Sequence, residues 1–289
     1  MSTFTTSDGV DLDVRDTGPT ASGRTLVLVH GWSQSRATWD RVVPSLAEHH
    51  RVVSYDQRGH GLSAKPDHGA RIARLATDLH ELTGHLGLSS YDLVGHSMGA
   101  SVGWSLVDNH GTGSLDSFVV LDQPSACVVL PWMTPEQGAE AGAILDFPTT
   151  EGFVGAVGAP DAREARHAFL ASMLSDAVPA DDLAHLFAEN LQMPGGWGAR
   201  LLLDHAMQDW RDVLPRIDVP VLVVGGEVSH VSPDSQRWTA AHVPGAQLRV
   251  FTAEEGGSHF PFFEGPEHFA TALLAFLADT PGPRAGQGG

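Results

Sequence analysis

The sequence predicts an α/β protein with a mostly parallel central sheet, helices on both faces of the sheet, and an inserted helical cap. In the first part of the chain, short apolar runs alternate with helical patterns, which is typical of a parallel sheet covered by helices. Strand-like runs then stop and resume near the C-terminal third. We therefore expect a core of residues 1–124 and 214–280, a helical cap of residues 125–213, and a disordered tail of residues 281–289.

The expected parallel strands are short, continuous apolar runs rich in β-branched residues, as in strands buried on both faces. At Val10–Asp16 apolar and polar residues alternate instead, which indicates an antiparallel edge strand. The parallel strands are expected at Leu26–His30, Arg51–Tyr55, Tyr91–Val94, Ser117–Leu121, Val219–Val224 and Gln247–Phe251.

Helical patterns lie between these strands and fill the cap. The cap helices begin at Thr134-Pro135-Glu136, where the threonine can cap, the proline suits the first helical position, and the acid favours the first turn. Pro179 and Pro194-Gly195-Gly196 separate later cap helices. The helices are expected at Ala37–His49, Ala70–Leu86, Met98–Asn109, about Asp161–Leu174, Ala180–Leu191 and Ala199–Trp210, and His268–Ala278.

Composition narrows the partners and the compartment. The formal net charge of −18 repels phosphate backbones and anionic membranes, so we expect a small-molecule substrate and neither nucleic acid nor a membrane as partner. Cys127 is the only cysteine, which excludes an intrachain disulfide and fits a reducing compartment. The first residues lack a signal-peptide pattern, and no apolar run approaches the roughly 20 residues that span a bilayer. A cytoplasmic location is therefore expected.

The candidate nucleophile is Ser97, in the run Val94-Gly95-His96-Ser97-Met98-Gly99. This Gly-x-Ser-x-Gly pattern follows the strand expected at Tyr91–Val94 and opens the helix expected at Met98–Asn109. A serine on such a strand–turn–helix bend is held in a strained conformation that exposes its Oγ, and the glycines allow close backbone approach. The helix N-terminus also favours the negative charge that develops in the reaction.

Attack on an acyl carbon needs two preset N–H donors for the charged oxygen. The amide of Met98, directly after the candidate nucleophile, is expected to be one donor. The other is expected in the loop His30-Gly31-Trp32, because Gly31 permits a tight turn and the amide of Trp32 follows it.

The candidate base is His259, one of 16 histidines. It follows the strand expected at Gln247–Phe251 across the glycine-rich loop Glu255-Gly256-Gly257-Ser258. This position places its imidazole at the carboxyl end of a strand, where loops build the sites of α/β sheets.

Taken together, four motifs resemble the ordered signatures of the α/β-hydrolase superfamily, over nearly all of residues 5–280. The resemblance implies the α/β-hydrolase fold, Ser97 as nucleophile, His259 as base, and the amides of Trp32 and Met98 as the oxyanion hole. Serine at position 97, on the bend between the strand and the helix, disfavours the dehalogenases and epoxide hydrolases, whose nucleophile is an aspartate. The motifs are His30-Gly31-Trp32, Asp56-Gln57-Arg58-Gly59-His60-Gly61, Gly95-His96-Ser97-Met98-Gly99 and Gly257-Ser258-His259-Phe260.

The carboxylate that would orient the candidate base is not at the sequence position common in this superfamily. In many members of that superfamily an Asp lies three residues beyond the glycine that ends the strand equivalent to Val219–Val224. Here Ser229 stands at that place, and a serine cannot balance an imidazolium charge. Asp122 ends the strand before the cap, and Asp122-Gln123-Pro124 resembles members that carry their acid there. Asp122 is the first candidate and Glu227 the second.

The leading hypothesis is a serine esterase or lactonase that cleaves a small to medium hydrophobic substrate through an acyl-enzyme. Two alternatives stay open: a cofactor-free dioxygenase of the same fold acting on a hydroxylated heteroaromatic ring, and a non-catalytic binding protein. A perhydrolase or haloperoxidase-like side activity is also compatible with such a cap. No metal or organic cofactor is expected, because the sequence shows neither an H-E-x-x-H motif nor a Cys/His cluster. Substrate identity and oligomeric state stay open.

Overall fold

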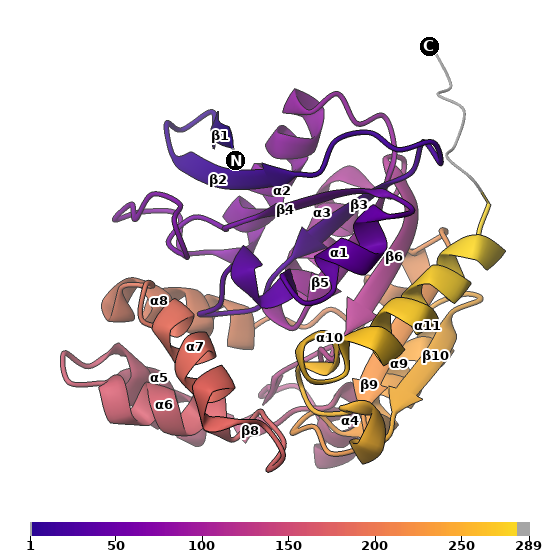
Figure 1. Cartoon of the computed structure of the whole chain (residues 1–289). Helices are drawn as coiled ribbons and strands as arrows, with labels where there is room; N and C mark the ends of the chain where they lie inside the picture. Colours follow the sequence, from indigo (N-terminus) through magenta and orange to yellow (C-terminus); the bar gives the residue numbers. More distant parts are fainter. Residues whose placement is uncertain (1, 282–289) are drawn as a thin grey trace.

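The computed structural model describes residues 2–281, whose central sheet has the strand order β1-β2-β4-β3-β5-β6-β9-β10 (Figure 1). β1 and β2 pair antiparallel, as do β2 and β4, and all pairs from β4 to β10 are parallel. The mostly parallel α/β sheet predicted from the sequence is therefore confirmed. The strands are β1 (Ser2–Thr5), β2 (Asp11–Asp16), β3 (Thr25–Val29), β4 (Arg51–Tyr55), β5 (Tyr91–His96), β6 (Leu115–Leu121), β9 (Val221–Gly226) and β10 (Gln247–Phe251). Residues 282–289 of the expected tail lie outside the described residues.

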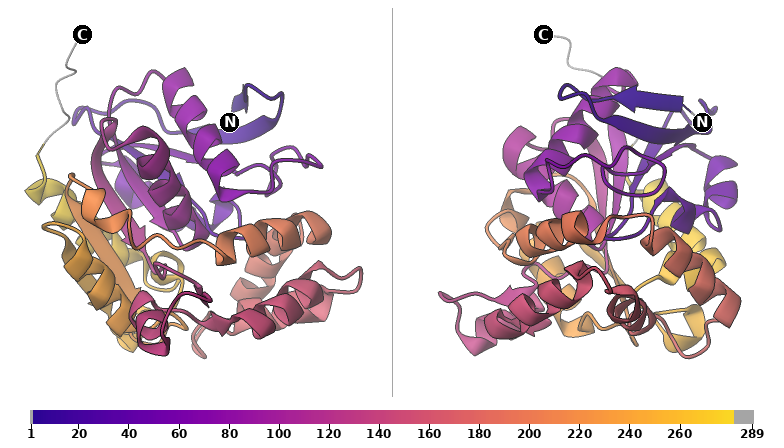
Figure 2. Two further views of the ribbon diagram at one scale, coloured as in Figure 1. Left: turned by 180° about the vertical axis from the view of Figure 1, so that it is seen from behind. Right: turned by 90° about the vertical axis from the view of Figure 1, so that its left-hand side faces the viewer.

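Helices cover both faces of the sheet, as Figure 2 shows from two further sides. Side chains of a strand point alternately to opposite faces, so Val27 and Val29 of β3 join one apolar core, whereas Leu26 and Leu28 join the other. Residues of α2, α3 and α9 pack in the first core, and residues of α1, α10 and α11 pack in the second. These helices are α1 (Val43–Ala47), α2 (Ile72–His85), α3 (Met98–His110), α9 (Pro233–His242), α10 (Pro261–Glu264) and α11 (Pro266–Asp279).

A helical segment is inserted between β6 and β9 and lies beyond the carboxyl ends of the parallel strands (Figures 1 and 2). In it α5 packs against α8 and α6 against α7, while α4 packs against α9 of the core. The insertion therefore covers the sheet edge at which parallel α/β sheets place their sites. Its elements are β7 (Val128–Val129), α4 (Pro135–Ala141), β8 (Leu145–Asp146), α5 (Phe147–Gly158), α6 (Arg163–Ala171), α7 (Ala180–Asn190) and α8 (Gly195–Ala206).

The prediction of one continuous helix over Ala37–His49 is wrong. The segment divides into the 3-10 turn η1 (Arg36–Trp39) and the short helix α1 (Val43–Ala47). Pro44 explains the division, because proline donates no backbone N–H and a continuous helix would need that donor to bond the carbonyl four residues earlier. It occupies the first turn of α1, where no N–H is needed.

Several elements of the structure were not predicted, because their residues show no clear strand or helix pattern in the sequence. The strand β1 (Ser2–Thr5) pairs outside β2, so the segment predicted as the edge strand lies between β1 and β4. The cap, expected to lack strands, contains the two-residue pair β7 and β8. Its helix α5 was not predicted, because three glycines and two threonines within Phe147–Gly158 weaken the helical pattern.

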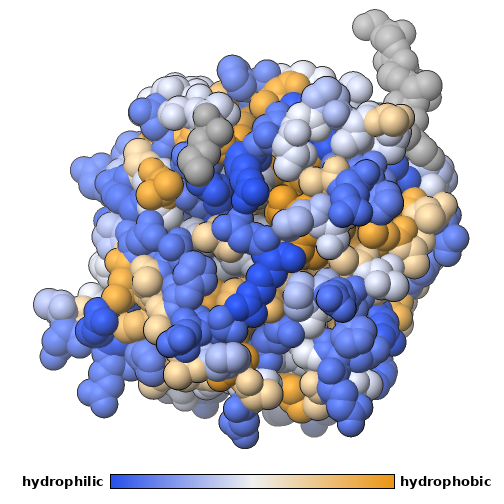
Figure 3. Space-filling view, in the orientation of Figure 1, coloured by the Kyte–Doolittle hydropathy of each residue, from blue (hydrophilic) through white to orange (hydrophobic). Residues whose placement is uncertain are grey.

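The surface is mainly polar. Figure 3 shows charged and polar residues over most of one face, with apolar residues scattered between them. Among residues 2–281, no helix is both long and apolar enough to cross a membrane.

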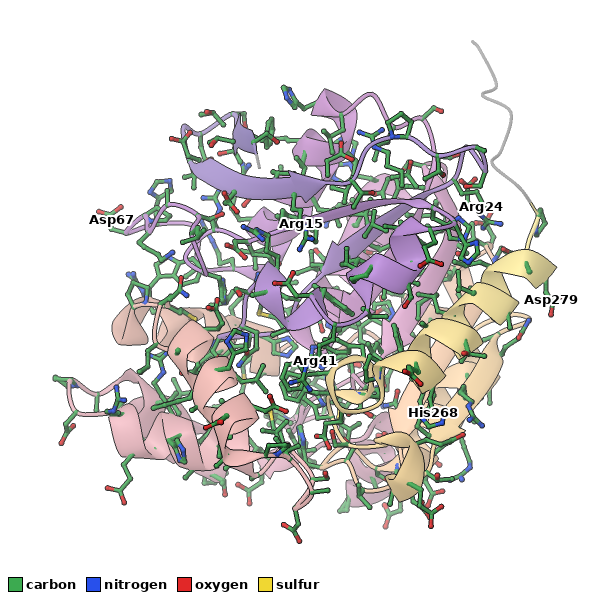
Figure 4. All side chains as sticks on the ribbon, in the orientation of Figure 1. Arg15, Arg24, Arg41, Asp67, His268 and Asp279 are labelled. Atoms are coloured by element: carbon green, nitrogen blue, oxygen red, sulfur yellow. The ribbon has the colours of Figure 1, made fainter. Side chains whose placement is uncertain are left out.

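Two arginines connect elements from within the interior. Arg24 binds both carboxylate oxygens of Asp92 and donates to the carbonyl oxygen of Leu277, beside the end of α11 (Figure 4). Arg58 has a fully buried side chain and binds both Asp78 and Asp8. A buried guanidinium needs such partners, because an uncompensated charge in the interior is strongly destabilising.

We predict that Arg58→Leu lowers the free energy of unfolding by up to about 3–5 kcal/mol, because the buried Asp78 then keeps only Arg74, which is partly exposed, as a counter-charge. Urea denaturation followed by circular dichroism measures the change. Arg216→Leu is the matched control: its pair with Asp108 is 49%/45% exposed, so the expected cost is about 0–1 kcal/mol. Equal losses in the two variants would contradict the prediction.

Candidate active site

A cavity of about 250 Å³ lies between the carboxyl edge of the sheet and the cap. It brings together segments that are far apart in the sequence, because the loops after β3, β5, β6, β9 and β10 all contribute to its wall. Ser97 and His259 both line it, together with apolar side chains of the cap. The wall consists of Gly31, Trp32, Gln34, His96, Ser97, Gln123, Pro124, Cys127, Ile144, Leu145, Thr150, Phe153, Val154, Phe169, Met173, Leu202, His205, Ala206, His230, Val231, His259 and Phe260.

Ser97 occupies the bend between β5 and α3, with φ 52° and ψ −125°. The two neighbouring glycines make this bend possible. A Cβ at Gly95 would lie 2.6 Å from the carbonyl oxygen of Gly99, and a Cβ at Gly99 would overlap the carbonyl oxygen of Val29 in β3. The helix can therefore cross the strands closely enough to present Ser97 to the cavity.

Backbone strain is concentrated around this cavity. In residues 2–281, the non-glycine residues with positive φ are Ser33, Ser97 and Asp122. Ser97 lines the cavity, and the other two are sequence neighbours of residues that do. Such conformations cost of order 1–3 kcal/mol each and persist only where surrounding contacts fix them. Their convergence is typical of a functional site.

His259 lines the cavity and contacts Asp122, which is fully buried behind the wall. The distance from Nδ1 of His259 to Oδ2 of Asp122 is 2.6 Å, and both side chains are buried. The same carboxylate oxygen accepts a hydrogen bond of 2.5 Å from Oγ of Ser229, and Oδ1 accepts from the amide of Gly226 at 3.3 Å. The structure therefore brings the end of β6 to the loop after β10, and it directs Nδ1 of the imidazole toward the carboxylate.

Burial shifts the pKa values of the imidazole and the carboxyl in opposite directions. It lowers the pKa of His259 below its usual value of 6.5, because the cavity wall disfavours the charged ring. It raises the pKa of Asp122, while the hydrogen bond from Ser229 acts against that rise. The imidazole is therefore neutral at neutral pH and its Nε2 can accept a proton.

Glu227, the second candidate acid, lies elsewhere. Its side chain is exposed and accepts a hydrogen bond from the amide of Ala253 at 3.0 Å. The turn after β9 instead places Ser229 on Asp122 and His230 against His259, with 4.4 Å between the ring centroids. Sequence reasoning identified Ser229 as a substituted position, but it did not predict that its hydroxyl would hold the carboxylate.

The loop after β3 lies directly beside Ser97. A Cβ at Gly31 would lie 3.1 Å from the Cβ of Ser97. The backbone amide of Gln57 donates to Nε2 of His30, so the ring carries its proton on Nδ1, which lies 2.8 Å from the carbonyl oxygen of Gly31. That carbonyl belongs to the same trans peptide as the amide of Trp32, and the two groups point in opposite directions. His30 therefore fixes the orientation of the Trp32 amide.

The amides of Trp32 and Met98 are available as donors. Within residues 2–281 neither amide donates to another backbone group. Met98 is the first residue of α3 and has no side-chain cap from Ser97, so its N–H is one of the unsatisfied donors of a helix start. Two donors of this kind suit an oxygen atom that gains negative charge.

Residues of the cap also hold the loop after β3 in place through hydrogen bonds. Nδ2 of Asn190 donates to Oγ of Ser33 at 2.6 Å, and Nε1 of Trp32 donates to the carbonyl oxygen of Gly198 at 2.9 Å. Arg166 holds Asn190 in turn, through a hydrogen bond of 2.8 Å to its Oδ1. The strained Ser33 is therefore supported by the inserted helices, a contact that the sequence pattern gave no means of predicting.

Comparison with known proteins agrees with this architecture. A family model described as the alpha/beta hydrolase fold matches residues 24–266. The chain is 29% identical over 294 residues to a non-heme chloroperoxidase of Kitasatospora aureofaciens, covering 96% of this chain and 99% of that protein.

Solved structures show the same fold at lower identity. A bromoperoxidase from Bacillus anthracis superposes with a TM-score of 0.85 at 24% identity, covering 96% of this chain and 100% of that chain. An esterase from Exiguobacterium antarcticum superposes with a TM-score of 0.84 at 21% identity, covering 96% and 99%. These similarities extend over the cap as well as the sheet.

We predict that Gly99→Ala lowers the free energy of unfolding by about 1–3 kcal/mol or more, because the added methyl group meets backbone atoms that cannot move aside. Thermal and urea unfolding measure the loss. Gly84→Ala is the matched control, since nothing lies within 4 Å of a Cβ at that exposed helical position. It should be neutral or should stabilise by about 0.5–1 kcal/mol. A Gly99→Ala protein as stable as the control would refute the close approach.

Proposed function

Since this chain belongs to the alpha/beta hydrolase fold family, we propose that it is a serine hydrolase that cleaves a carboxylic ester or a lactone through an acyl-enzyme. One observation carries the proposal: the buried contact of 2.6 Å between Asp122 and His259, a residue that lines the same cavity as Ser97. A neutral imidazole oriented by a carboxylate is the base that a serine nucleophile requires.

In the proposed acylation, His259 accepts the hydroxyl proton of Ser97 on Nε2 as Oγ attacks the acyl carbon. Asp122 holds the tautomer with the proton on Nδ1 and stabilises the imidazolium that forms. The oxygen of the acyl group becomes negatively charged and accepts hydrogen bonds from the amides of Trp32 and Met98. The imidazolium then donates its proton to the leaving alcohol, and the ester bond breaks.

Deacylation repeats these steps with water in place of the serine. His259 accepts a proton from the water molecule, the hydroxide attacks the acyl carbon, and the bond to Ser97 breaks as the imidazolium returns a proton to its oxygen. In a lactone the leaving hydroxyl stays attached to the acyl group, so the single product is a hydroxy acid.

The cavity limits the size and polarity of the substrate. Its volume of about 250 Å³ exceeds the roughly 150 Å³ of a cavity that binds benzene, and it lies near the lower end for ligand pockets. Cap side chains make much of its wall apolar, among them Phe153, Phe169 and Leu202. We therefore expect a small hydrophobic ester or lactone.

A second candidate is supported by the name of the chloroperoxidase relative. The acyl-enzyme at Ser97 can be attacked by hydrogen peroxide instead of water, which releases a peracid and the free serine. The peracid then oxidises a halide outside the protein. Halogenation that requires both a carboxylic acid and peroxide, and that is lost in Ser97→Ala, would favour this activity.

The first test compares wild type with Ser97→Ala on a panel of small 4-nitrophenyl esters and lactones. Wild type should hydrolyse members of the panel, and the variant should lose several orders of magnitude in kcat. An organophosphonate should label wild type at Ser97. Oxygen uptake with hydroxylated heteroaromatic substrates and no esterase activity would point to a dioxygenase. Tight binding without labelling would point to a binding protein.

We predict that Asp122→Asn lowers kcat by about four orders of magnitude, because an asparagine amide favours the wrong tautomer of His259. Steady-state kinetics on the best ester measures the loss. Glu227→Gln is the matched control and should keep the wild-type rate, since Glu227 contacts neither Ser97 nor His259 in the structure. Comparable rates in both variants would exclude Asp122 as the acid.

A variant that moves the carboxylate from position 122 to position 229 tests the same assignment more sharply. Oγ of Ser229 is 2.5 Å from Oδ2 of Asp122, so an aspartate at position 229 would bring its carboxylate to the same region. Adding Ser229→Asp to Asp122→Asn should recover part of the lost kcat. Adding Ser229→Asn, which has the same shape without the charge, should recover none.

The pH dependence follows from the shift of His259. Burial lowers its pKa below 6.5, so the unprotonated base persists as the pH falls below 6.5 and is lost only when the pH passes the lower value. We predict that the acid limb of kcat/KM lies below pH 6.5. Rates measured from about pH 4 to about pH 8, with circular dichroism at each pH to confirm folding, test this. A midpoint at or above 6.5 would contradict it.

A further inference from the structure

A second imidazole, that of His230, lies beside the proposed base. His230 follows Ser229 in the turn after β9 and lines the cavity. Its ring centroid is 4.4 Å from that of His259, and the two rings are tilted by 57°. Neither the proposed acylation nor the proposed deacylation uses it. Two histidine rings are therefore adjacent in the wall that Ser97 also lines.

The two nitrogens of the His230 ring lie in different surroundings. Nδ1 is buried and has no hydrogen-bond partner within residues 2–281, whereas Nε2 is not enclosed in this way, because the half-buried side chain opens onto the cavity. The other histidines of the wall use Nε2 inside the protein. In His96 it lies 2.8 Å from the carbonyl oxygen of His259, and in His205 it lies 3.7 Å from Sγ of Cys127. His230 therefore presents a polar atom to the contents of the cavity.

The surroundings of this atom are apolar. The ring of Phe169 packs beside His230, with 6.5 Å between the centroids, and it also packs beside Phe153 and Trp32. A water molecule is held in such a cavity where about two to four polar groups contact it. Nε2 of His230 and Nε2 of His259 supply two of them, because two hydrogen bonds of about 3 Å each can bridge adjacent rings.

We propose that His230 is a further catalytic residue, whose Nε2 holds the water molecule that attacks the acyl-enzyme. This inference rests on the proposed serine hydrolysis and assigns a residue to its second half. The water contacts both imidazoles. His259 accepts one proton from it as its oxygen bonds to the acyl carbon, the bond to Oγ of Ser97 then breaks, and that proton passes to Oγ. His230 neither gains nor loses a proton, since a neutral imidazole nitrogen donates or accepts one hydrogen bond.

The two imidazoles differ in how a positive charge would be stabilised. Nδ1 of His259 contacts Asp122 at 2.6 Å, whereas Nδ1 of His230 has no partner within residues 2–281. The imidazolium therefore forms on His259. Burial lowers the pKa of His230 to about 3, and the neighbouring His259 adds to this effect. The ring of His230 is thus neutral and does not repel the charge that develops beside it.

Deacylation depends on such a contact more than acylation does. The leaving alcohol is part of the substrate until the ester bond breaks, so substrate binding already places it. Water is a separate molecule, and holding it against the acyl carbon removes an entropic cost that can amount to orders of magnitude in rate. Loss of the His230 ring should therefore slow deacylation and leave acylation by an activated ester nearly unchanged.

Stopped-flow release of 4-nitrophenol from 4-nitrophenyl acetate separates the two steps. The burst phase and kcat/KM report acylation, and quenched-flow decay of the acetyl-enzyme, read by mass spectrometry, measures deacylation directly. His230→Leu should lower the deacylation rate constant by at least about tenfold. Its acylation rate constant should stay within about twofold of wild type. The acetyl-enzyme should accumulate in this variant, and Ser97→Ala should form none.

Two further variants separate the role of the nitrogen from that of the fold. His230→Gln brings an amide group near the position of Nε2 and should keep deacylation within about threefold of wild type. His49→Leu makes the same chemical change as His230→Leu at an exposed position and serves as the matched control. His230→Leu should have a Tm equal to or above that of His49→Leu, because it removes a buried nitrogen that lacks a protein partner.

The outcomes distinguish this inference from the proposed function. Equal losses in acylation and deacylation, or no loss in deacylation, would overturn the role of His230 alone. Deacylation in His230→Gln as slow as in His230→Leu would overturn it as well, and so would a Tm of His230→Leu well below that of His49→Leu. An absence of any Ser97-dependent burst or hydrolysis in wild type, on this ester and on the wider panel, would overturn the proposed function and this inference together.

Discussion

The hydrogen bond between His259 and Asp122 connects the parts of the molecule on which the site depends. Asp122 ends β6 and His259 follows β10, so their contact at 2.6 Å requires the parallel strands to end at one edge and the loops to fold over it. The surrounding groups satisfy the carboxylate, because Ser229 and Gly226 donate to its two oxygens. A carboxyl group without exposure to water needs such donors to stay ionised.

The sheet edge supports this contact through strained backbone and very close packing. Ser33, Ser97 and Asp122 have positive φ, and each lies in a loop that follows a parallel strand. The strain is tolerated because neighbouring elements fix each position. Gly95 and Gly99 let α3 approach β3, and Asn190 of the cap holds Ser33. The cap is therefore a structural part of the site as well as its cover.

The carboxylate beside His259 can come from different strands of the same fold and still occupy the same position in space. Ser229 stands in the turn after β9, where many members of the superfamily carry an aspartate, yet its hydroxyl reaches the carboxylate that Asp122 supplies from β6. The same point beside His259 is thus reached from two neighbouring strands. In parallel sheets adjacent strand ends lie about 5 Å apart, which makes such a relocation geometrically simple.

The sequence alone predicted the parallel strands of the central sheet, the presence of inserted helices, and the motifs around Ser97, Trp32 and His259, but not the short strands β1, β7 and β8 or the helix α5. These features depend on local periodicity and on glycines at sharp turns, which are visible in neighbouring residues. It left the acid open between Asp122 and Glu227, and only the tertiary structure showed Asp122 against His259 and Glu227 exposed, with its carboxylate on the amide of Ala253. The support from Ser229 and Asn190 also required coordinates. Contacts between residues that are more than a hundred positions apart depend on how strands and loops pack, and no local pattern records that packing.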